Sequence, residues 1–295
     1  MAKPVFTGSG VALVTPFDRT GAVNYAKLRQ LTDWHIDQQT DAIIVCGTTG
    51  EASTLTAQEK IETIQTVIEQ TAGRVPVIAG TGANDTALAV SLSQNAQKLG
   101  ADALLLVTPY YNKATQSGLI KHFTRIADHV DIPCILYNVP SRTTVNIHVD
   151  TYEILANHPH IVATKEASGN LAVMQRIKNV CADKLDIYSG NDELYLPALS
   201  VGAIGNISVI ANILPRQSHE MYRLFTNGYM DSCTKMQLEW IDLLDSLFSQ
   251  VNPIPIKTAM NLMGMEVGSC RLPLCDMDTA PINELKAVLK KHELI

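Results

Sequence analysis

The stretch IVATKEASGNLAVMQRIKNVC (161–181) joins a short apolar run, a polar turn and a segment of helical periodicity. Residues 161–166 have the composition of a buried strand, and Gly169 breaks the run before a helix expected over 170–181. Lys165 is unusual because it places a charge at the end of this strand. Two interpretations are open. The side chain could bury its stem and extend its ammonium outward to water, or it could be a desolvated amine used as a nucleophile.

The same strand–turn–helix unit recurs along the chain. Strands are expected at GVALVT (10–15), AIIVCG (42–47), VPVIAG (75–80), ALLLVT (103–108), PCILYN (133–138), IVATKE (161–166), LDIYSG (185–190) and AIGNIS (203–208). Helices are expected, among others, at 24–39, 56–72, 84–99, 115–130 and 170–181. Strands that are apolar on both faces and alternate with helices predict a parallel sheet covered by helices. Eight such units, at intervals of about 20 to 35 residues, favour an α/β fold of the (β/α)8 TIM-barrel type over a doubly wound open sheet.

The barrel is expected to occupy residues 1–225, followed by a C-terminal helical region over 226–295. Two amphipathic segments of that region, TKMQLEWIDLLDSLF (234–248) and IPIKTAMNLMG (254–264), predict additional helices. These helices would cover the outside of the barrel or form an oligomer contact.

The composition excludes several classes of protein. Of 295 residues, 46% are apolar, 18% are charged and only 5% are aromatic, which predicts a large aliphatic core. A net charge of −6, without a basic run, argues against nucleic acid or an anionic membrane as partner. The longest apolar runs, such as 103–107, are too short to cross a bilayer, and the N-terminus lacks a signal-peptide core. We therefore expect a soluble, cytoplasmic protein.

The six cysteines are scattered, as is typical of reduced thiols in a reducing compartment. Cys270 and Cys275 are the only close pair, and no histidine near them completes a zinc site. No metal is expected.

Polar side chains with chemical uses follow several of the expected strands. In a TIM barrel, functional groups lie at the C-terminal ends of the strands and in the loops after them. GTTGE (47–51) offers the hydroxyls of Thr48 and Thr49 for a carboxylate, although the motif is also typical of an ordinary glycine turn with a helix cap. Tyr137 at a strand end could shuttle protons, and Arg142 suits a bidentate grip on a carboxylate.

These groups make chemical sense together as a Schiff-base site. A lysine in water has a pKa of about 10.4 and is protonated at neutral pH, whereas burial favours the neutral, nucleophilic amine. Such an amine attacks a ketone, and the resulting iminium acidifies the adjacent carbon. Glu166 should face away from Lys165 because side chains alternate along a strand, so it is not assigned a catalytic role. GTG (80–82) lacks the third glycine of a dinucleotide fingerprint and is interpreted as a tight turn.

With GTTGE, TPYYNK (108–113), YNVPSRT and TKEASG in this order and spacing, the sequence resembles the dihydrodipicolinate synthase family of class I, pyruvate-dependent aldolases. The resemblance runs from GVALVTPF (10–17) through YSGND (188–192) and NPIPIK (252–257) to RLPL (271–274). It implies a carbon–oxygen lyase that condenses pyruvate with L-aspartate 4-semialdehyde to 4-hydroxy-tetrahydrodipicolinate. This is the first committed step of the diaminopimelate and lysine pathway. It also implies no cofactor beyond the covalent Schiff base, and a homotetramer built from tight dimers.

The resemblance assigns a role to each candidate residue. Lys165 forms the Schiff base with pyruvate, and Gly190 and Ile207 line the site with their backbones. The proton relay consists of Tyr137, Thr48 and Tyr111, the last reaching into the site of a neighbouring subunit. Thr49 binds the carboxylate of pyruvate, and Arg142 binds that of the semialdehyde.

Other functions remain open from the sequence. N-acetylneuraminate lyase and the sugar-acid aldolases share the lysine and the tyrosine but take other second substrates, and Arg142 favours a small acidic aldehyde. A catalytically dead barrel that acts as a scaffold would be expected to lack Lys165, Tyr137 or Thr48, and all three are present. A metal-dependent aldolase is disfavoured because the sequence offers no ligand set.

Feedback inhibition by lysine, which the family implies for many members, is expected to be weak or absent here. Sensitive members commonly carry histidines at the positions of Ala57 and Lys60 and a glutamate at that of Leu88, whereas Asn84 and Tyr110 are retained. A ligand ammonium that leaves water needs a compensating anion, and Leu88 supplies none.

Overall fold

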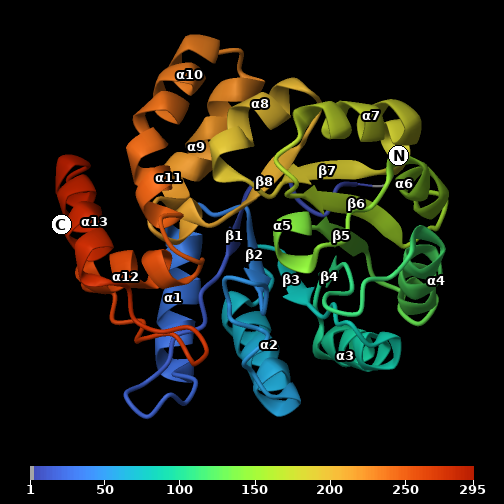
Figure 1. Cartoon of the computed structure of the whole chain (residues 1–295), viewed down its shortest axis with the longest axis horizontal. Helices are drawn as coiled ribbons and strands as arrows, with labels where there is room; N and C mark the ends of the chain where they lie inside the picture. The colour runs from blue at the N-terminus through green and yellow to red at the C-terminus, as the bar shows by residue number, and fades with distance from the viewer. Residues whose placement is uncertain (1–2) are drawn as a thin grey trace.

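The computed structural model describes residues 3–295 of the chain. Within this range eight parallel strands form one closed barrel in the order of the sequence (Figure 1). The strands are β1 (Gly8–Ala12), β2 (Ala42–Val45), β3 (Val77–Gly80), β4 (Ala103–Val107), β5 (Cys134–Asn138), β6 (Ile161–Glu166), β7 (Asp186–Ser189) and β8 (Gly205–Ser208). Pairing of β1 with β8 closes the sheet. The predicted TIM barrel is confirmed.

Helices surround this barrel (Figure 1). The longer ones are α1 (Tyr25–Asp37), α2 (Ala57–Thr71), α3 (Thr86–Leu99), α4 (Gln116–Ala127), α6 (Val149–Leu155), α7 (Leu171–Cys181) and α9 (Pro215–Thr226). Short turns of helix, α5 (Pro140–Thr143) and α8 (Tyr195–Ser200), follow β5 and β7. The helices α6, α8 and α9 were not among those named from the sequence pattern.

Side-chain caps fix where several of these helices begin. Thr56 accepts a hydrogen bond from the backbone N–H of Glu59, and the Glu59 carboxylate accepts one from the backbone N–H of Thr56. This reciprocal capping box satisfies two backbone donors at the start of α2. Asn24, Asp85 and Asn170 cap α1, α3 and α7 in the simpler one-sided way. Capping therefore explains why the predicted helix starts agree with the structure to within two residues.

Two apolar layers fill the molecule. One lies inside the barrel and includes Ile44, Ile135, Tyr137, Ala163 and Ile207, and the other fills the space between the barrel and the helices. Because side chains alternate along a strand, Ala163 in the inner layer implies that Lys165 also faces the barrel interior.

Several strands are shorter than predicted, and β2 shows the reason. The predicted strand ran to Gly47, whereas β2 ends at Val45. Cys46 has φ of 55°, a left-handed conformation that cannot continue a strand. The apolar run therefore continues past the point where the backbone leaves the sheet.

The C-terminal region differs from the single helix predicted over 234–248. The helix is interrupted at Trp240, so that α10 (Met230–Glu239) and α11 (Ile241–Leu247) are separate. Trp240 is buried, and the two helices pack on different neighbours. The helix α10 packs on α8 and α9, whereas α11 packs on α12 (Ile254–Leu262) and α13 (Thr279–Lys291). One continuous helix could not make both sets of contacts.

The last helix, α13 (Thr279–Lys291), was not predicted. In Figure 1 the helices α11 to α13 lie on the side of the barrel that carries α1. The helix α9 ends at Thr226, so the division into a barrel of residues 1–225 and a helical region of residues 226–295 falls in its last turn. We retain that division as a proposal. No helix of residues 3–295 has the length and hydropathy needed to span a membrane.

Candidate active site

Lys165 and Tyr137 occupy paired positions on neighbouring strands. The register of β5 and β6 places Tyr137 directly beside Lys165, and both side chains face the barrel interior. The Nζ atom of Lys165 lies 4.3 Å from the centroid of the Tyr137 ring. Each residue is only 6% exposed. The alternative of a strand-end lysine that extends outward into water is therefore wrong.

Gly190, directly after β7, leaves the space that the lysine side chain uses. A Cβ atom at this position would lie 3.0 Å from Cε of Lys165 and 2.6 Å from Cβ of Ala167. The N–H of Gly190 donates to the carbonyl of Glu166 at 2.8 Å, which holds the glycine against the end of β6. Ile207, on β8, is buried in the same inner layer as Tyr137.

Glu166 faces away from Lys165, as predicted. Its carboxylate accepts hydrogen bonds from Asn138 Nδ2 at 3.0 and 3.2 Å, from the hydroxyl of Tyr152 at 3.1 Å, and from the N–H of Ser168 at 2.8 Å. Burial and this carboxylate raise the pKa of Tyr152 well above its ordinary value, so the phenol remains a donor. Asn138 and Glu166 thus join the two strands one residue beyond Tyr137 and Lys165.

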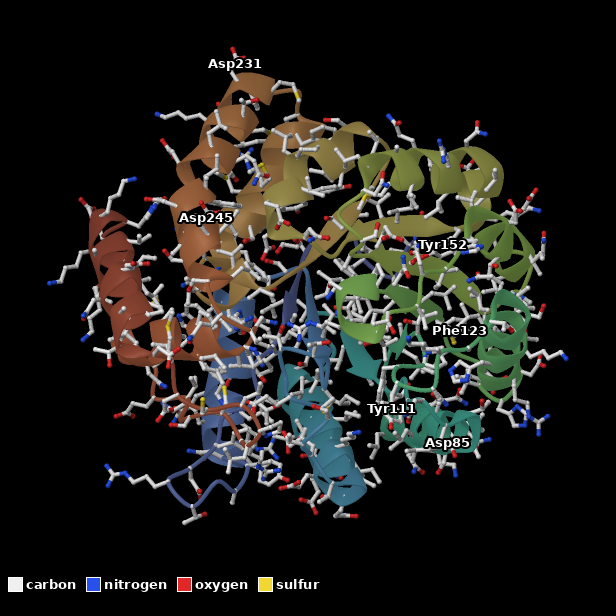
Figure 2. All side chains as sticks on the ribbon, viewed as in Figure 1. Asp85, Tyr111, Phe123, Tyr152, Asp231 and Asp245 are labelled. Carbon is white, nitrogen blue, oxygen red and sulfur yellow. The ribbon has the colours of Figure 1, made fainter. Side chains whose placement is uncertain are left out.

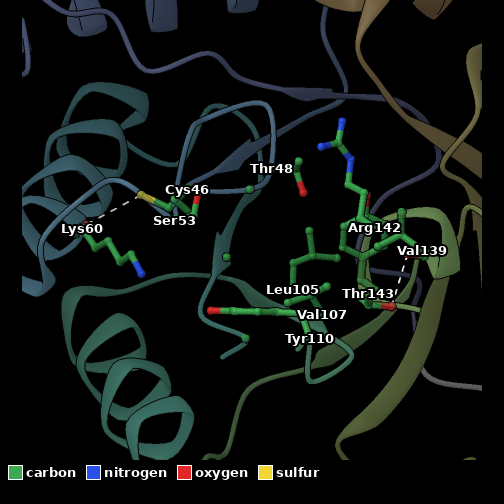
Figure 3. A pocket seen from close by; sticks show the side chains of 15 residues that line it. Cys46, Thr48, Ser53, Lys60, Leu105, Val107, Tyr110, Val139, Arg142 and Thr143 are labelled. Atoms are coloured by element: carbon green, nitrogen blue, oxygen red, sulfur yellow. Dashed lines mark hydrogen bonds between the residues drawn. The ribbon is translucent and has the colours of Figure 1, made fainter. Parts of the chain in front are cut away.

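A cavity of about 300 Å³ opens beside this pair (Figure 3). Thr48, Tyr137, Val139, Arg142 and Thr143 line one end of it, where Arg142 is carried by α5. The cavity therefore brings together hydroxyls, a phenol and a guanidinium near the lysine. Thr49, Lys165, Gly190 and Ile207 are not part of this wall, and Lys165 adjoins the cavity through its contact with the ring of Tyr137.

The other end of the cavity is lined by Cys46, Ser53, Lys60 and Tyr110 (Figure 3). Burial lowers the pKa of Lys60 and raises that of the Cys46 thiol to about 12. At neutral pH the thiol is therefore protonated and a poor nucleophile. The polar groups at this end thus include one amine and no carboxylate.

The glycines of GTG (80–82) allow close backbone packing beside the cavity. A Cβ atom at Gly80 would overlap the carbonyl of Cys46, and one at Gly82 would overlap the backbone N of Val107. Their role is steric, which agrees with the predicted tight turn.

Thr48 and Thr49 belong to a loop that is fixed by distant residues. Glu51, the last residue of GTTGE, is 2% exposed and has φ of 53°. One of its oxygens accepts a hydrogen bond from Lys257 Nζ at 2.9 Å, and the other accepts one from the N–H of Arg271 at 2.9 Å. Lys257 also donates to the carbonyls of Thr15 and Ser269, at 3.1 and 2.8 Å. All three donors of this buried ammonium are thus satisfied.

Thr49 and Arg142 are both held by Asn252. The side-chain Nδ2 of Asn252 donates to Oγ1 of Thr49 at 3.0 Å, and its backbone carbonyl accepts from Nη2 of Arg142 at 3.0 Å. The sequence analysis assigned no role to Asn252, Lys257 or Arg271, although the motifs NPIPIK and RLPL that contain them were part of the resemblance. Their separation from the site in sequence is the reason they were missed.

The ion pairs of residues 3–295 include neither Lys165 nor Arg142. Both basic side chains are therefore without a carboxylate partner in the described chain. No carboxylate of residues 3–295 would therefore compete with an anionic substrate for these two side chains.

Tyr111 lies apart from the other candidates. Its side chain is 90% exposed, its φ is 71°, and it is not in the wall of the cavity (Figure 2). The neighbouring Tyr110 does line the cavity. Within residues 3–295 the Tyr111 side chain is therefore not part of the wall that contains Tyr137 and Arg142.

The described residues contain no group of three or more histidine, cysteine, aspartate or glutamate side chains placed to hold a metal ion. All six cysteines are free thiols.

A buried lysine beside a tyrosine, at the strand ends of a (β/α)8 barrel and next to a cavity that carries hydroxyls and an arginine, defines the class of pyruvate-dependent class I aldolases. The model of the dihydrodipicolinate synthetase family matches residues 5–292, and the chain belongs to this family. The expected family is therefore confirmed.

Individual relatives agree with this assignment. A 4-hydroxy-tetrahydrodipicolinate synthase of Thermoanaerobacter sp. (strain X514) is 54% identical over 293 residues, which are 99% of this chain and 98% of the relative. The crystal structure of dihydrodipicolinate synthase from Aquifex aeolicus is 46% identical with a TM-score of 0.96, covering 98% of this chain and 99% of the other. A crystal structure of the enzyme from Cyanidioschyzon merolae with lysine bound is 40% identical with a TM-score of 0.97, covering 99% and 100% of the two chains.

Proposed function

We propose that this protein condenses pyruvate with L-aspartate 4-semialdehyde to give 4-hydroxy-tetrahydrodipicolinate, the reaction of 4-hydroxy-tetrahydrodipicolinate synthase and the entry to diaminopimelate and lysine biosynthesis. The observation that carries the proposal is the buried Lys165, held against Tyr137 beside a cavity that contains Thr48 and Arg142. Family membership and the names of the relatives support it.

Lys165 is the proposed covalent centre, and no other cofactor is proposed. Its neutral amine attacks C2 of pyruvate, and loss of water gives an iminium. Loss of a proton from C3 then gives an enamine, whose C3 attacks the aldehyde carbon of the semialdehyde. The amino group of that second substrate closes the ring at C2 and releases Lys165. The first step requires the neutral form of this amine, whose side chain is buried at 6% exposure.

Proton transfer is assigned to Tyr137, Thr48 and Tyr111. The ring of Tyr137 lies 4.3 Å from Nζ of Lys165, and the Thr48 side chain lines the same cavity as Tyr137. The exposure of Tyr111 is compatible with a relay that is completed only when two subunits meet. We therefore propose an oligomer in which Tyr111 of one subunit enters the site of the other, a homotetramer built from tight dimers.

The two substrate carboxylates have separate proposed partners. Thr49 binds that of pyruvate, while Gly190 and Ile207 line the site near Lys165 with their backbones. Arg142, which has no ion pair within residues 3–295 and whose guanidinium can present a two-pronged donor, binds that of the semialdehyde. We also propose a cytoplasmic location, where the six free thiols would stay reduced.

Weak or absent inhibition by lysine is proposed for this chain, although the relative from Cyanidioschyzon merolae was crystallised with lysine. Lys60 brings an amine into the cavity end that also contains Tyr110. Leu88, 45% exposed on α3, supplies no anion for a ligand ammonium, and Ala57 offers no polar group. A second ammonium near Lys60 would be repelled and left uncompensated.

The proposed reaction is tested by steady-state assays of the purified protein with pyruvate and L-aspartate 4-semialdehyde, and separately with N-acetylneuraminate. We expect turnover of the first pair and no cleavage of the second substrate. Efficient cleavage of N-acetylneuraminate, with no condensation of the semialdehyde, would contradict the proposed substrate.

A further inference from the structure

Asn252 connects the two residues proposed to bind the substrate carboxylates. It lies just before α12, is 5% exposed, and is 203 residues from Thr49 and 110 from Arg142 along the chain. Its side chain contacts Thr49 and its backbone carbonyl contacts Arg142. One residue of the C-terminal region is therefore hydrogen-bonded to both of the proposed carboxylate-binding residues.

The hydrogen bond from Asn252 decides how the Thr49 hydroxyl can be used. An amide nitrogen only donates, so Oγ1 of Thr49 is the acceptor in this contact. No acceptor for the hydroxyl proton of Thr49 is found within residues 3–295. The proton therefore remains available to a carboxylate. A hydroxyl free to rotate would have to give up a competing orientation before it donated to the ligand.

The backbone carbonyl of Asn252 holds Arg142 without neutralising it. A carbonyl is a neutral acceptor, and it occupies one of the five N–H donors of the guanidinium. A carboxylate in its place would compensate the positive charge and compete with the substrate. The geometry thus fixes the position of Arg142 and keeps its charge for a ligand.

The side-chain oxygen of Asn252 is buried without a hydrogen-bond donor in the described chain. An unsatisfied buried acceptor is unfavourable for folding. An apolar side chain at position 252 would stabilise the fold more than this amide does. The hydrogen bond from Nδ2 to Thr49 therefore explains why the residue is an asparagine.

We infer that Asn252 is a positioning residue that orients the Thr49 hydroxyl as a donor to the carboxylate of pyruvate while its backbone holds Arg142. This inference rests on the proposed function. It concerns the use of pyruvate, because the side chain acts on Thr49 and only the backbone acts on Arg142.

The test is a double-mutant cycle. Asn252→Leu removes the amide donor at similar volume, and is combined with Thr49→Val, which removes the hydroxyl, and with Thr49→Ser, which keeps it. In the wild-type and Thr49→Ser backgrounds we expect Asn252→Leu to raise KM for pyruvate about 5- to 20-fold with a less than threefold change in kcat. In the Thr49→Val background the same change should be less than twofold.

Thermal melting of each variant separates positioning from stability. Should Asn252→Leu fail to fold, Asn252→Asp, which replaces the donor by an acceptor, takes its place in the cycle with the same expectation of a loss confined to backgrounds that have the hydroxyl. An equal rise in the pyruvate KM in all three backgrounds, or no rise in any, would overturn the inference. Absence of pyruvate-dependent product with the unmutated protein would instead refute the proposed function, and the two failures are thus distinguishable.

Discussion

The site has two halves that are positioned in different ways. Lys165 and Tyr137 stand on adjacent strands, where the register of the sheet itself sets their separation. Thr48 and Thr49 stand on a loop, which depends on contacts with residues 252–271 of the C-terminal region. The difference indicates that the barrel positions the proposed covalent centre, whereas the added C-terminal region positions the residues proposed to bind carboxylates.

The anchors of the two halves also differ in kind. The strand half is tied by neutral donors to a single carboxylate, as in the bonds of Asn138 and Tyr152 to Glu166. The loop half depends on a buried ion pair, with Lys257 and Glu51 at most 2% exposed on their side chains. Because a buried charge left without its partner is costly, the loop half should be the more sensitive to loss of one residue.

The largest expected effect is on turnover and belongs to the strand half. Lys165→Ala should lower kcat by about 10³-fold or more because it removes the amine proposed to form the covalent intermediate. Lys60→Ala is the matched control, since Lys60 is an amine of the same cavity that is given no role in catalysis, and it should stay within about tenfold of the wild type. Steady-state kinetics on variants with unchanged melting temperature check this prediction. Retention of turnover by Lys165→Ala would show that Lys165 is not required for the reaction.

The next effect is on stability and belongs to the loop half. Lys257→Met should lower the free energy of unfolding by about 3 to 5 kcal/mol, because Glu51 is then a buried carboxylate without its cation. Lys235→Met removes the exposed pair with Glu239 and should cost less than about 1 kcal/mol. Chemical denaturation of both variants measures the difference. Equal costs for the two substitutions would show that the buried pair does not hold the loop.

A smaller, selective effect separates the two carboxylate sites. Arg142→Ala should lower kcat/KM for the semialdehyde and leave pyruvate binding nearly unchanged. The expected loss of transition-state stabilisation is about 2 to 5 kcal/mol. Arg142→Lys keeps the charge but loses the planar fork, so an intermediate loss is expected. If KM for pyruvate rose while the semialdehyde kinetics stayed constant, the roles of Arg142 and Thr49 would have to be exchanged.

The smallest expected effect is that of lysine. Initial rates should fall by less than about twofold up to millimolar lysine, because the cavity end at Lys60 lacks an anion for the ligand ammonium. Leu88→Glu combined with Lys60→His should introduce inhibition if charge is the missing element. Half-inhibition of the wild type at submillimolar lysine would contradict this account.

The strand half could be predicted from the sequence, and the loop half only in part. Alternation along 161–166 is enough to place Lys165 and Glu166 on opposite faces of the strand, since side-chain direction in a strand is local. The positions of Thr49 and Arg142 depend on Asn252, which no local pattern connects with them. The interruption at Trp240 was missed for the same reason, because the amphipathic period continues across it while the packing partners change.

The central claim is that Lys165 forms the covalent bond with pyruvate, and borohydride trapping tests it most directly. Protein treated with pyruvate and borohydride, then digested and analysed by mass spectrometry, should carry one reduced adduct, on the peptide that contains Lys165. Lys165→Ala should show no adduct, and neither should wild type treated without pyruvate. An adduct on a different lysine that persists in Lys165→Ala would contradict the account.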